Sequence, residues 1–191
     1  IISVFSGSRI FEVETLVPIL IKFIKLMNKK YEDFIYIFHT TKTTHNTVYK
    51  FLKESDLKNY EIISDPKIKE HIIEKSIFSV VKSGTISLEI CAKKIPSIII
   101  YKMNIVNFVI LKLLVKVKFA NIINIAANKM IIPELLQNDC NAKNIFNKVS
   151  EYLEDEKKIT NQILETQKVL QDLKVKDSPT SIAAEILKSH I

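Results

Sequence analysis

Short apolar segments alternate with segments of helical pattern along much of this 191-residue chain. The apolar segments are apolar throughout rather than at every second residue, which is typical of strands that are covered on both faces. Strands that alternate with helices in this way form a parallel sheet. The sequence therefore predicts an α/β fold, a Rossmann-like parallel sheet with helices on both faces. The expected strands are Ile1–Phe5, Asp33–Phe38, Tyr60–Ile63, Ile77–Val81 and Ser97–Tyr101.

The helices expected between the strands are Thr15–Lys29, Thr47–Glu54, Lys67–Lys75 and Thr85–Lys93. The first contains Pro18, which a helix tolerates in its first turn, so this helix should begin near Thr15. We expect residues 1–150 to form a ligand-binding domain and residues 151–191 to add helices that pack on it or reach toward another domain. The C-terminal third is expected to be helical, at Glu134–Gln137, Ala142–Leu153, Asp155–Leu173 and Thr180–Ser189.

The chain carries a formal net charge of +7 and has a pI near 9.2, which favours anionic partners. Arg9 is its only arginine. Nucleic-acid readers rely on arginine for contacts with base edges, and basic residues are not interleaved with aromatic ones here. We therefore expect no nucleic-acid partner. The alternative, a basic nucleic-acid-binding domain, would bind DNA or RNA in a salt-sensitive way.

Cys91, Cys140 and the four histidines do not have the spacing of metal ligands, and no Asp-x-Asp motif occurs. We therefore expect no metal and no other cofactor. The cysteines are expected to be reduced core thiols, which suits a cytoplasmic compartment. Because no apolar run approaches the ~18 residues of a spanning helix and no signal peptide is recognisable, we do not expect the chain to cross a membrane.

The chain contains only two glycines, far fewer than average usage would give. Both lie in predicted strand-to-helix turns with hydroxyl neighbours, in Ser6-Gly7-Ser8-Arg9 and in Ser83-Gly84-Thr85. Such a turn presents backbone N–H groups, and glycine lets a phosphate approach the main chain closely. Parallel sheets bind ligands beyond the carboxyl ends of their strands, so the two turns together favour a diphosphate. Neither turn is a GxGxxG fingerprint or a P-loop, which argues against NAD-dependent and ATP-hydrolysing enzymes.

Two charged residues extend this candidate site. Arg9 lies at the lip of the first turn, where its guanidinium could neutralise a departing diphosphate; a surface ion pair is the alternative. Glu89 lies about one turn into the helix after the second glycine, where its carboxylate could accept hydrogen bonds from both ribose hydroxyls; a solvated helix glutamate is the alternative.

At these residues the sequence resembles the lipid-A-disaccharide synthase family. Phe5-Ser6-Gly7-Ser8-Arg9 followed by Glu12-Val13-Glu14 is similar to the family's GSR-x-x-E-V-E block. Ser83-Gly84-Thr85 followed by Leu88-Glu89 is similar to its SGT-x-x-L-E block. The resemblance covers nearly the whole chain. A third group of residues follows the family's order, with Pro96, Tyr101-Lys102-Met103, Asn124 and Pro133-Glu134-Leu135-Leu136-Gln137.

The resemblance implies the C-terminal half of a two-domain GT-B glycosyltransferase, the half that binds the UDP-sugar donor, without the N-terminal domain that binds the acceptor. The chain begins at Ile1, inside an apolar run, so we expect it to be cut from a longer protein and to be inactive alone. The implied reaction of lipid A and lipopolysaccharide biosynthesis transfers 2,3-diacylglucosamine from its UDP donor to 2,3-diacylglucosamine 1-phosphate, giving lipid A disaccharide and UDP. The implied partners are this acylated donor, the lipid acceptor and a membrane surface, with a cytoplasmic location, peripheral on the inner membrane.

The resemblance also implies roles for individual residues. Arg9 would act in catalysis by meeting the charge of the leaving diphosphate without a metal. The family's proposed acidic catalytic residue would lie in the absent half. The UDP donor would be bound by Ser8, Ser83, Gly84, Thr85, Glu89 and Asn124, with weaker expectations for Gly7, Glu12, Tyr101 and Met103.

Two further stretches of the sequence are informative. Asn128-Lys129 departs from the Gly-Arg pair that relatives often show. The segment Asn104–Phe119, apolar with interspersed lysines, fits either a helix on a membrane surface or a buried helix.

The first alternative function is another UDP-sugar GT-B enzyme, such as the peptidoglycan N-acetylglucosaminyltransferase or a UDP-sugar epimerase. The second is a catalytically inert UDP-binding fragment.

Overall fold

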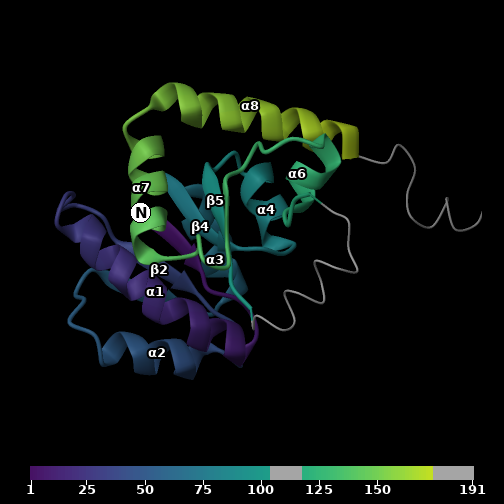
Figure 1. Ribbon diagram of the computed structural model, residues 1–191. Helices are drawn as coiled ribbons and strands as arrows, with labels where there is room; N and C mark the ends of the chain where they lie inside the picture. The colour runs from purple at the N-terminus through teal and green to yellow at the C-terminus, as the bar shows by residue number, and fades with distance from the viewer. Residues whose placement is uncertain (104–117, 174–191) are drawn as a thin grey trace, which may run out of the picture.

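The computed structural model describes residues 1–103 and 118–173. Its six strands form one parallel sheet in the order β3-β2-β1-β4-β5-β6, with helices on both faces (Figure 1). This confirms the predicted α/β, Rossmann-like fold. The strands are β1 (Ile2–Phe5), β2 (Tyr36–His39), β3 (Tyr60–Ile63), β4 (Phe78–Lys82), β5 (Ser97–Tyr101) and β6 (Glu134–Leu136).

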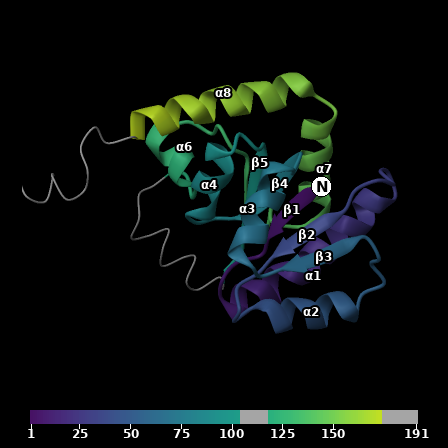
Figure 2. The ribbon, with the colours of Figure 1, turned by 180° about the vertical axis from the view of Figure 1, so that it is seen from behind.

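The strand order reverses between β1 and β4. From β1 the chain adds β2 and β3 on one side (Figure 2), and it then crosses back to place β4 against the other side of β1. Phe5 at the end of β1 lies opposite Val81, one residue before the end of β4. The turns that follow these two strands, which contain the two glycines, are therefore neighbours at the edge where open α/β sheets bind ligands.

Alternate residues of the central strands point into two hydrophobic cores, one on each face of the sheet. Val4 and Val80 belong to a core that is completed by α1, α2 and α7. Phe5 and Val81 belong to a second core that is completed by α3, α4, α6 and α8. Because both faces are covered, successive residues of the central strands are buried. The described helices are α1 (Ile10–Asn28), α2 (His45–Lys53), α3 (Pro66–Glu74), α4 (Ile86–Ala92), α6 (Ile122–Ala127), α7 (Ala142–Leu153) and α8 (Glu156–Leu173).

The first helix begins earlier than the sequence indicated. It begins at Ile10, so Pro18 lies in its interior, and the expectation that Pro18 marks the first turn is wrong. Proline cannot donate to the carbonyl of Glu14, four residues before it. Glu14 lies on the exposed face of the helix, where solvent can hydrate this carbonyl.

The segment after Pro133 was expected to be a helix, and this prediction is also wrong. Glu134–Leu136 forms β6, which pairs in parallel with β5, and Leu135 packs against the larger core. The open edge of β5 offers hydrogen-bond partners that so short a segment could not supply to itself as a helix. The predicted helix Thr180–Ser189 and nearly all of the apolar segment Asn104–Phe119 lie outside the described residues.

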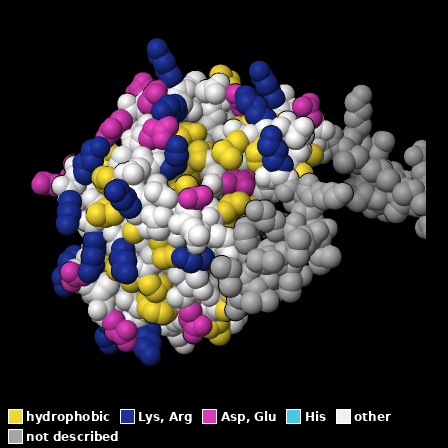
Figure 3. All heavy atoms as spheres, in the orientation of Figure 1, with side chains coloured by type: hydrophobic (Ala, Val, Ile, Leu, Met, Phe, Trp, Pro, Cys, Tyr) yellow, Lys and Arg dark blue, Asp and Glu magenta, His cyan; other side chains and the backbone are white. Residues whose placement is uncertain are grey.

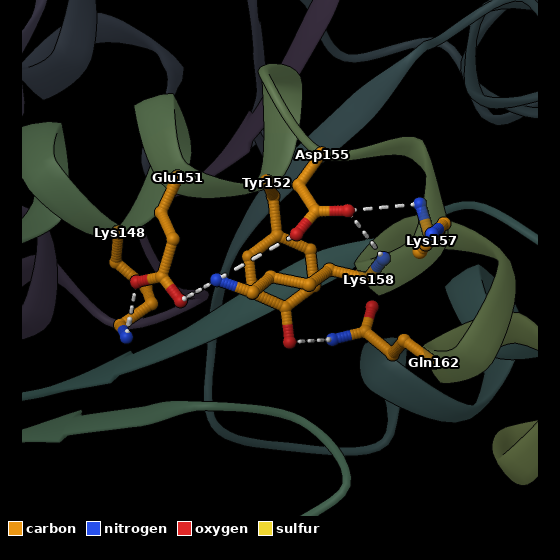
Figure 4. A network of polar contacts seen from close by, with 7 residues as sticks. All are labelled: Lys148, Glu151, Tyr152, Asp155, Lys157, Lys158 and Gln162. Carbon is orange, nitrogen blue, oxygen red and sulfur yellow. Dashed lines mark hydrogen bonds and ion pairs between the residues drawn. The ribbon is translucent and has the colours of Figure 1, made fainter.

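The connection between α7 and α8 is held by polar contacts (Figure 4). The carboxylate of Asp155 accepts hydrogen bonds from the N–H groups of Lys157 and Lys158, at 3.0 and 3.3 Å. Glu151 on α7 forms ion pairs with Lys148, at 2.6 Å, and with Lys158, at 2.7 Å. These contacts satisfy the first turn of α8 and fix the corner at which the chain turns back over the sheet.

Gln162 fastens α8 to the sheet. Its Oε1 accepts a hydrogen bond from the N–H of Ser97 at 2.7 Å, and its Nε2 donates to the carbonyl of Ser97 at 3.0 Å. α8 also packs against α4, α6 and α7. The domain boundary expected after residue 150 falls inside α7, and residues 151–173 pack on the rest of the fold.

The surface mixes charges of both signs. On the face in Figure 3, lysines are interspersed with carboxylates over much of the surface, so the positive charge does not form one continuous basic patch there. Within residues 1–103 and 118–173, no helix combines the length and the hydropathy that crossing a membrane requires.

We predict that Gln162→Ala lowers the free energy of unfolding by about 2–4 kcal/mol, because both peptide groups of Ser97 lose a buried partner. Urea denaturation followed by circular dichroism measures this. The control is Asn161→Ala, which removes one exposed contact with Glu165 and should change the free energy by less than about 0.5 kcal/mol. Equal destabilisation by the two variants would contradict the anchoring role of Gln162.

Candidate functional site

A pocket of about 280 Å³ opens beyond the carboxyl ends of β1, β2 and β4, where the strand order reverses. Both glycine turns line it. Of the residues singled out from the sequence, Gly7 and Ser8 line it from the first turn. The second turn contributes Ser83, Gly84 and Thr85. The structure therefore brings together two turns that are far apart in the sequence.

The first turn is built around the buried carboxylate of Glu12. Its Oε2 accepts hydrogen bonds from the N–H groups of Ser8 and Arg9, at 3.0 and 3.3 Å. These N–H groups, which the sequence suggested were free for a phosphate, are thus occupied. Gly7 has a φ of +113°, and a Cβ at this position would lie 2.4 Å from Oε2 of Glu12. Gly7 is therefore required by both its backbone conformation and the approach of this carboxylate.

Glu12 also joins the two turns. Its Oε1 forms an ion pair with Nζ of Lys82, the last residue of β4, at 2.8 Å. Burial by itself would raise the pKa of Glu12. The hydrogen bond and charge of Lys82, together with the N–H groups of Arg9 and Ser8, outweigh burial and lower this pKa. Glu12 is therefore ionised and has a structural role at the rim of the pocket.

The second glycine differs from the first. A Cβ on Gly84 would meet no atom within 4 Å, and Gly84 is not among the residues with positive φ. The fold itself therefore does not require glycine here, contrary to the expectation that both glycines serve special backbone needs. Beside it, the hydroxyl of Ser83 donates a hydrogen bond to the carbonyl of Ala120 at 2.9 Å. Gly84 also lines the pocket, and it has no side chain to cover its main chain there.

Arg9 and Glu89 lie beside the pocket rather than in its lining. The side chain of Arg9 is 70% exposed, and its Nη1 lies 3.6 Å from Oε1 of Glu12. Glu89, on α4, pairs with Lys69 of α3 at 2.8 Å, and Lys69 lines the pocket. A ligand that reached Glu89 from the pocket would therefore also lie beside Lys69.

Asn124 lies elsewhere and uses its hydrogen-bonding capacity within the fold. It is 0% exposed, and its Oδ1 accepts from the N–H groups of Ile131 and Ile132, both at 2.9 Å. Its Nδ2 donates to Glu134 and to the carbonyl of Ile132, both at 2.7 Å. This position does not agree with the expectation that Asn124 lines the donor site. The neighbouring Asn128 has a φ of +47°, a conformation that asparagine and glycine adopt most readily.

Tyr101 and Met103 also have structural surroundings. The ring centroid of Tyr101 lies 5.2 Å from Nζ of Lys82, so the ring packs beside the ammonium group that pairs with Glu12. Gln137 holds the main chain of Met103: its Oε1 accepts from the N–H at 2.8 Å, and its Nε2 donates to the carbonyl at 3.2 Å. This contact joins the Tyr-Lys-Met and Pro-Glu-Leu-Leu-Gln segments of this chain.

His39, at the end of β2, lines the pocket and is joined to two buried serines. Its Nε2 lies 2.9 Å from Oγ of Ser3, which lies 2.7 Å from Oγ of Ser76. Ser76 donates its hydroxyl proton to the carbonyl of Ile72. With the hydroxyl proton of Ser76 on Ile72, Ser3 can donate to Ser76 and accept from Nε2–H of His39. Nδ1 of His39 is buried and has no hydrogen-bond partner in the described part of the chain.

The imidazole of His39 is neutral. It is 5% exposed and stacks on Phe5, with ring centroids 4.3 Å apart. Burial and, secondarily, the positive charge of Lys69 lower the pKa of His39 to about 3. His39 therefore does not act as a general acid at neutral pH.

Two pocket lysines, Lys69 and Lys82, were not among the site residues predicted from the sequence. Lysine is abundant along the chain, so neither stood out by residue type. A signal was nevertheless available for Lys82. It is the last residue of an apolar strand and directly precedes a glycine turn, which places it at the carboxyl edge of the sheet. Within residues 1–103 and 118–173, no cluster of His, Cys, Asp and Glu could hold a metal ion.

We predict opposite outcomes for alanine at the two glycines. Gly7→Ala should lower the free energy of unfolding by about 2 kcal/mol or more, since alanine is strained at this φ and its Cβ meets Glu12. Gly84→Ala should leave the free energy unchanged or raise it by up to about 1 kcal/mol. Urea denaturation compares the two variants, and similar losses at both positions would be inconsistent with this geometry.

We predict that His39 makes stability depend on pH. Its pKa in the folded chain is about 3, below its ordinary value of 6.5, so only the unfolded chain binds a proton between these values. Stability is therefore full above pH 6.5 and is lost as the pH falls, by about 2 kcal/mol between pH 7 and pH 5. His39→Gln should remove this part of the pH dependence in urea denaturation, whereas the exposed control His71→Gln should retain it.

Comparison with known proteins identifies relatives of the whole chain. The family model described as Lipid-A-disaccharide synthetase matches residues 1–186. The lipid-A-disaccharide synthases of Rickettsia typhi and Rickettsia prowazekii are 37% and 36% identical over 192 residues, which are 100% of this chain and 50% of each relative. The chain thus spans about half the length of these curated relatives.

Solved structures share the fold at low sequence identity. A variant of Staphylococcus aureus TarM in complex with UDP has a TM-score of 0.59 and 14% identity, over 98% of this chain and 34% of its own. UDP-GlcNAc 2-epimerase from Neisseria meningitidis, bound to UDP-GlcNAc, has a TM-score of 0.58 and 12% identity, over 90% and 44%. Acinetobacter baumannii MurG has a TM-score of 0.54 and 8% identity, over 87% and 44%. These likenesses establish the fold, and the family match over residues 1–186 establishes that this chain belongs to the lipid-A-disaccharide synthetase family.

Proposed function

We propose that this chain is the donor-binding half of a lipid-A-disaccharide synthase and that the pocket between the β1 and β4 turns holds the UDP end of the donor. The observation that carries the proposal is the pocket itself, which lies at the reversal of the strand order and is lined by both glycine turns. The family match supports the sugar-transfer chemistry. The fold relatives described with UDP or UDP-GlcNAc support a UDP ligand.

The proposed reaction moves 2,3-diacylglucosamine from its UDP donor to 2,3-diacylglucosamine 1-phosphate. The bond from the anomeric carbon to the diphosphate breaks while the acceptor hydroxyl forms the new glycosidic bond. The UDP that leaves keeps the bonding electrons, so the negative charge on its diphosphate grows in the transition state. Groups that stabilise this charge in the pocket accelerate the reaction. The proton of the acceptor hydroxyl would pass to a base that we place on the other half of the protein.

The second turn and two flanking side chains have the following proposed roles. Gly84 would offer its main chain to the diphosphate, with Thr85 beside it in the pocket lining. Glu89 would exchange its contact with Lys69 for the ribose hydroxyls. Arg9, whose side chain is mostly exposed at the lip of the pocket, would turn from Glu12 toward the leaving group.

The remaining partners belong to the same proposal. The acceptor is a lipid, and the substrates carry acyl chains, so we place the protein at the cytoplasmic face of the inner membrane as a peripheral protein. A net charge of +7 suits an anionic lipid surface. The other half of the protein would close over the pocket and supply the acceptor site.

Calorimetric titration of the chain with UDP tests the proposal. We expect saturable binding, weakened about tenfold or more by Gly84→Ala, because the added methyl group occupies the space next to the diphosphate. Arg9→Ala and Glu89→Ala should each weaken binding severalfold. Gly84→Ala is its own folding control, since its unfolding midpoint should be no lower than that of the original chain.

A folded chain that does not bind UDP would contradict the proposed site.

Transfer assays with the whole protein distinguish between the enzymes that share this fold. Formation of lipid A disaccharide from the acylated UDP donor identifies the proposed enzyme. Epimerisation of UDP-GlcNAc, or transfer to another acceptor, would instead identify a different UDP-sugar enzyme.

A further inference from the structure

We propose that Lys82 is the principal cation of this pocket, that it contacts the diphosphate of the bound nucleotide, and that Glu12 holds its ammonium group in place for this purpose. The inference rests on the proposed function, because it takes the UDP end of the donor as the ligand. It assigns the main electrostatic role to a residue other than Arg9.

Lys82 occupies the point where the two glycine turns meet. It is the last residue of β4, it directly precedes Ser83, and its strand is paired with β1. Its side chain lines the pocket and is 17% exposed. A phosphate that contacted both Gly7 and Gly84 would therefore lie beside this ammonium group.

The ammonium group is held before any ligand arrives. Nζ of Lys82 lies 2.8 Å from Oε1 of Glu12 and 5.2 Å from the ring centroid of Tyr101. An exposed lysine loses the freedom of a long side chain when it binds an anion. Here the carboxylate and the ring have already restricted that freedom. An ammonium group has three donors, so its pairing with Glu12 leaves donors for a phosphate.

The first turn makes this cation necessary. The carboxylate of Glu12 is 4% exposed, and it takes the N–H groups of Ser8 and Arg9. The turn therefore brings a negative charge to the pocket, and two of the N–H groups that could have attracted an anion are occupied. Without Lys82, a diphosphate would face a buried carboxylate. Lys82 balances the charge of Glu12, and the ammonium donors that Glu12 does not use remain for a phosphate.

The other nearby cations are less suited to this role. Arg9 does not line the pocket, and its nearest charge is the same Glu12 carboxylate at 3.6 Å. Lys69 lines the pocket from α3 and is paired with Glu89 at 2.8 Å. Its charge also acts on His39, at the end of β2. Lys69 therefore lies toward the β2 side of the pocket, whereas Lys82 lies between the two glycine turns.

The test compares UDP with uridine, which lacks the phosphates. Lys82→Met should raise the dissociation constant for UDP about tenfold or more, since a charge-assisted hydrogen bond is lost. The dissociation constant for uridine, measured by ligand-observed NMR, should change less than twofold. The salt dependence of UDP binding should also decrease. Lys148→Met, which removes a lysine that is likewise paired with a glutamate but lies on α7, should change neither ligand's affinity.

Lys82→Met leaves Glu12 without its counterion and is expected to lower stability. The double variant Glu12→Gln/Lys82→Met removes both charges and retains one carbonyl oxygen at position 12 that can accept from the N–H groups of Ser8 and Arg9. It should fold normally and should still bind UDP severalfold more weakly than the original chain, with uridine binding unchanged. Equal losses for UDP and uridine, or no loss, would overturn the role of Lys82 while leaving the UDP site intact. An original chain that binds no UDP would overturn the proposed function and this inference together.

Discussion

The carboxylate of Glu12 is buried at the start of α1, and much of the site is arranged around its need for hydrogen-bond donors. It receives the N–H groups of Ser8 and Arg9 and the ammonium group of Lys82. A buried charge without such partners would be costly, so the turn, the beginning of the helix and the end of β4 are constrained together. Gly7 is glycine because this carboxylate leaves no room for a Cβ.

A second set of contacts fastens the far side of the pocket. The hydroxyl of Ser83 donates to Ala120, and Glu134 of β6 accepts from the N–H groups of Ala120 and Asn121. Asn121 in turn donates to Ser87 of α4. The segment that follows residue 117 is therefore tied both to the second glycine turn and to the edge strand. The addition of β6 to the sheet thus helps to position the site.

From the sequence, the positions of the backbone turns in the site were predicted more accurately than the roles of its side chains. The two glycine turns were expected at one edge of the sheet, and both line the pocket. The role expected for Asn124 does not agree with its burial, and the lysines at positions 69 and 82 went unassigned. Glycine is rare in this chain and therefore informative, whereas lysine is common, so residue type alone does not distinguish a pocket lysine from a surface one.

The sequence by itself determined the α/β class, the parallel sheet and the place of the two turns. Apolar strands that alternate with helices indicate that the sheet is buried on both faces, and this pattern is visible in residues that are neighbours in the sequence. Tertiary structure alone decided that residues 134–136 form a strand, that α1 begins eight residues before Pro18, and that Glu12 pairs with Lys82. Each of these outcomes depends on a partner distant in sequence or on how a helix terminus is satisfied in space. Hydrogen-bond and charge partners of this kind are chosen by packing, which residue patterns do not encode.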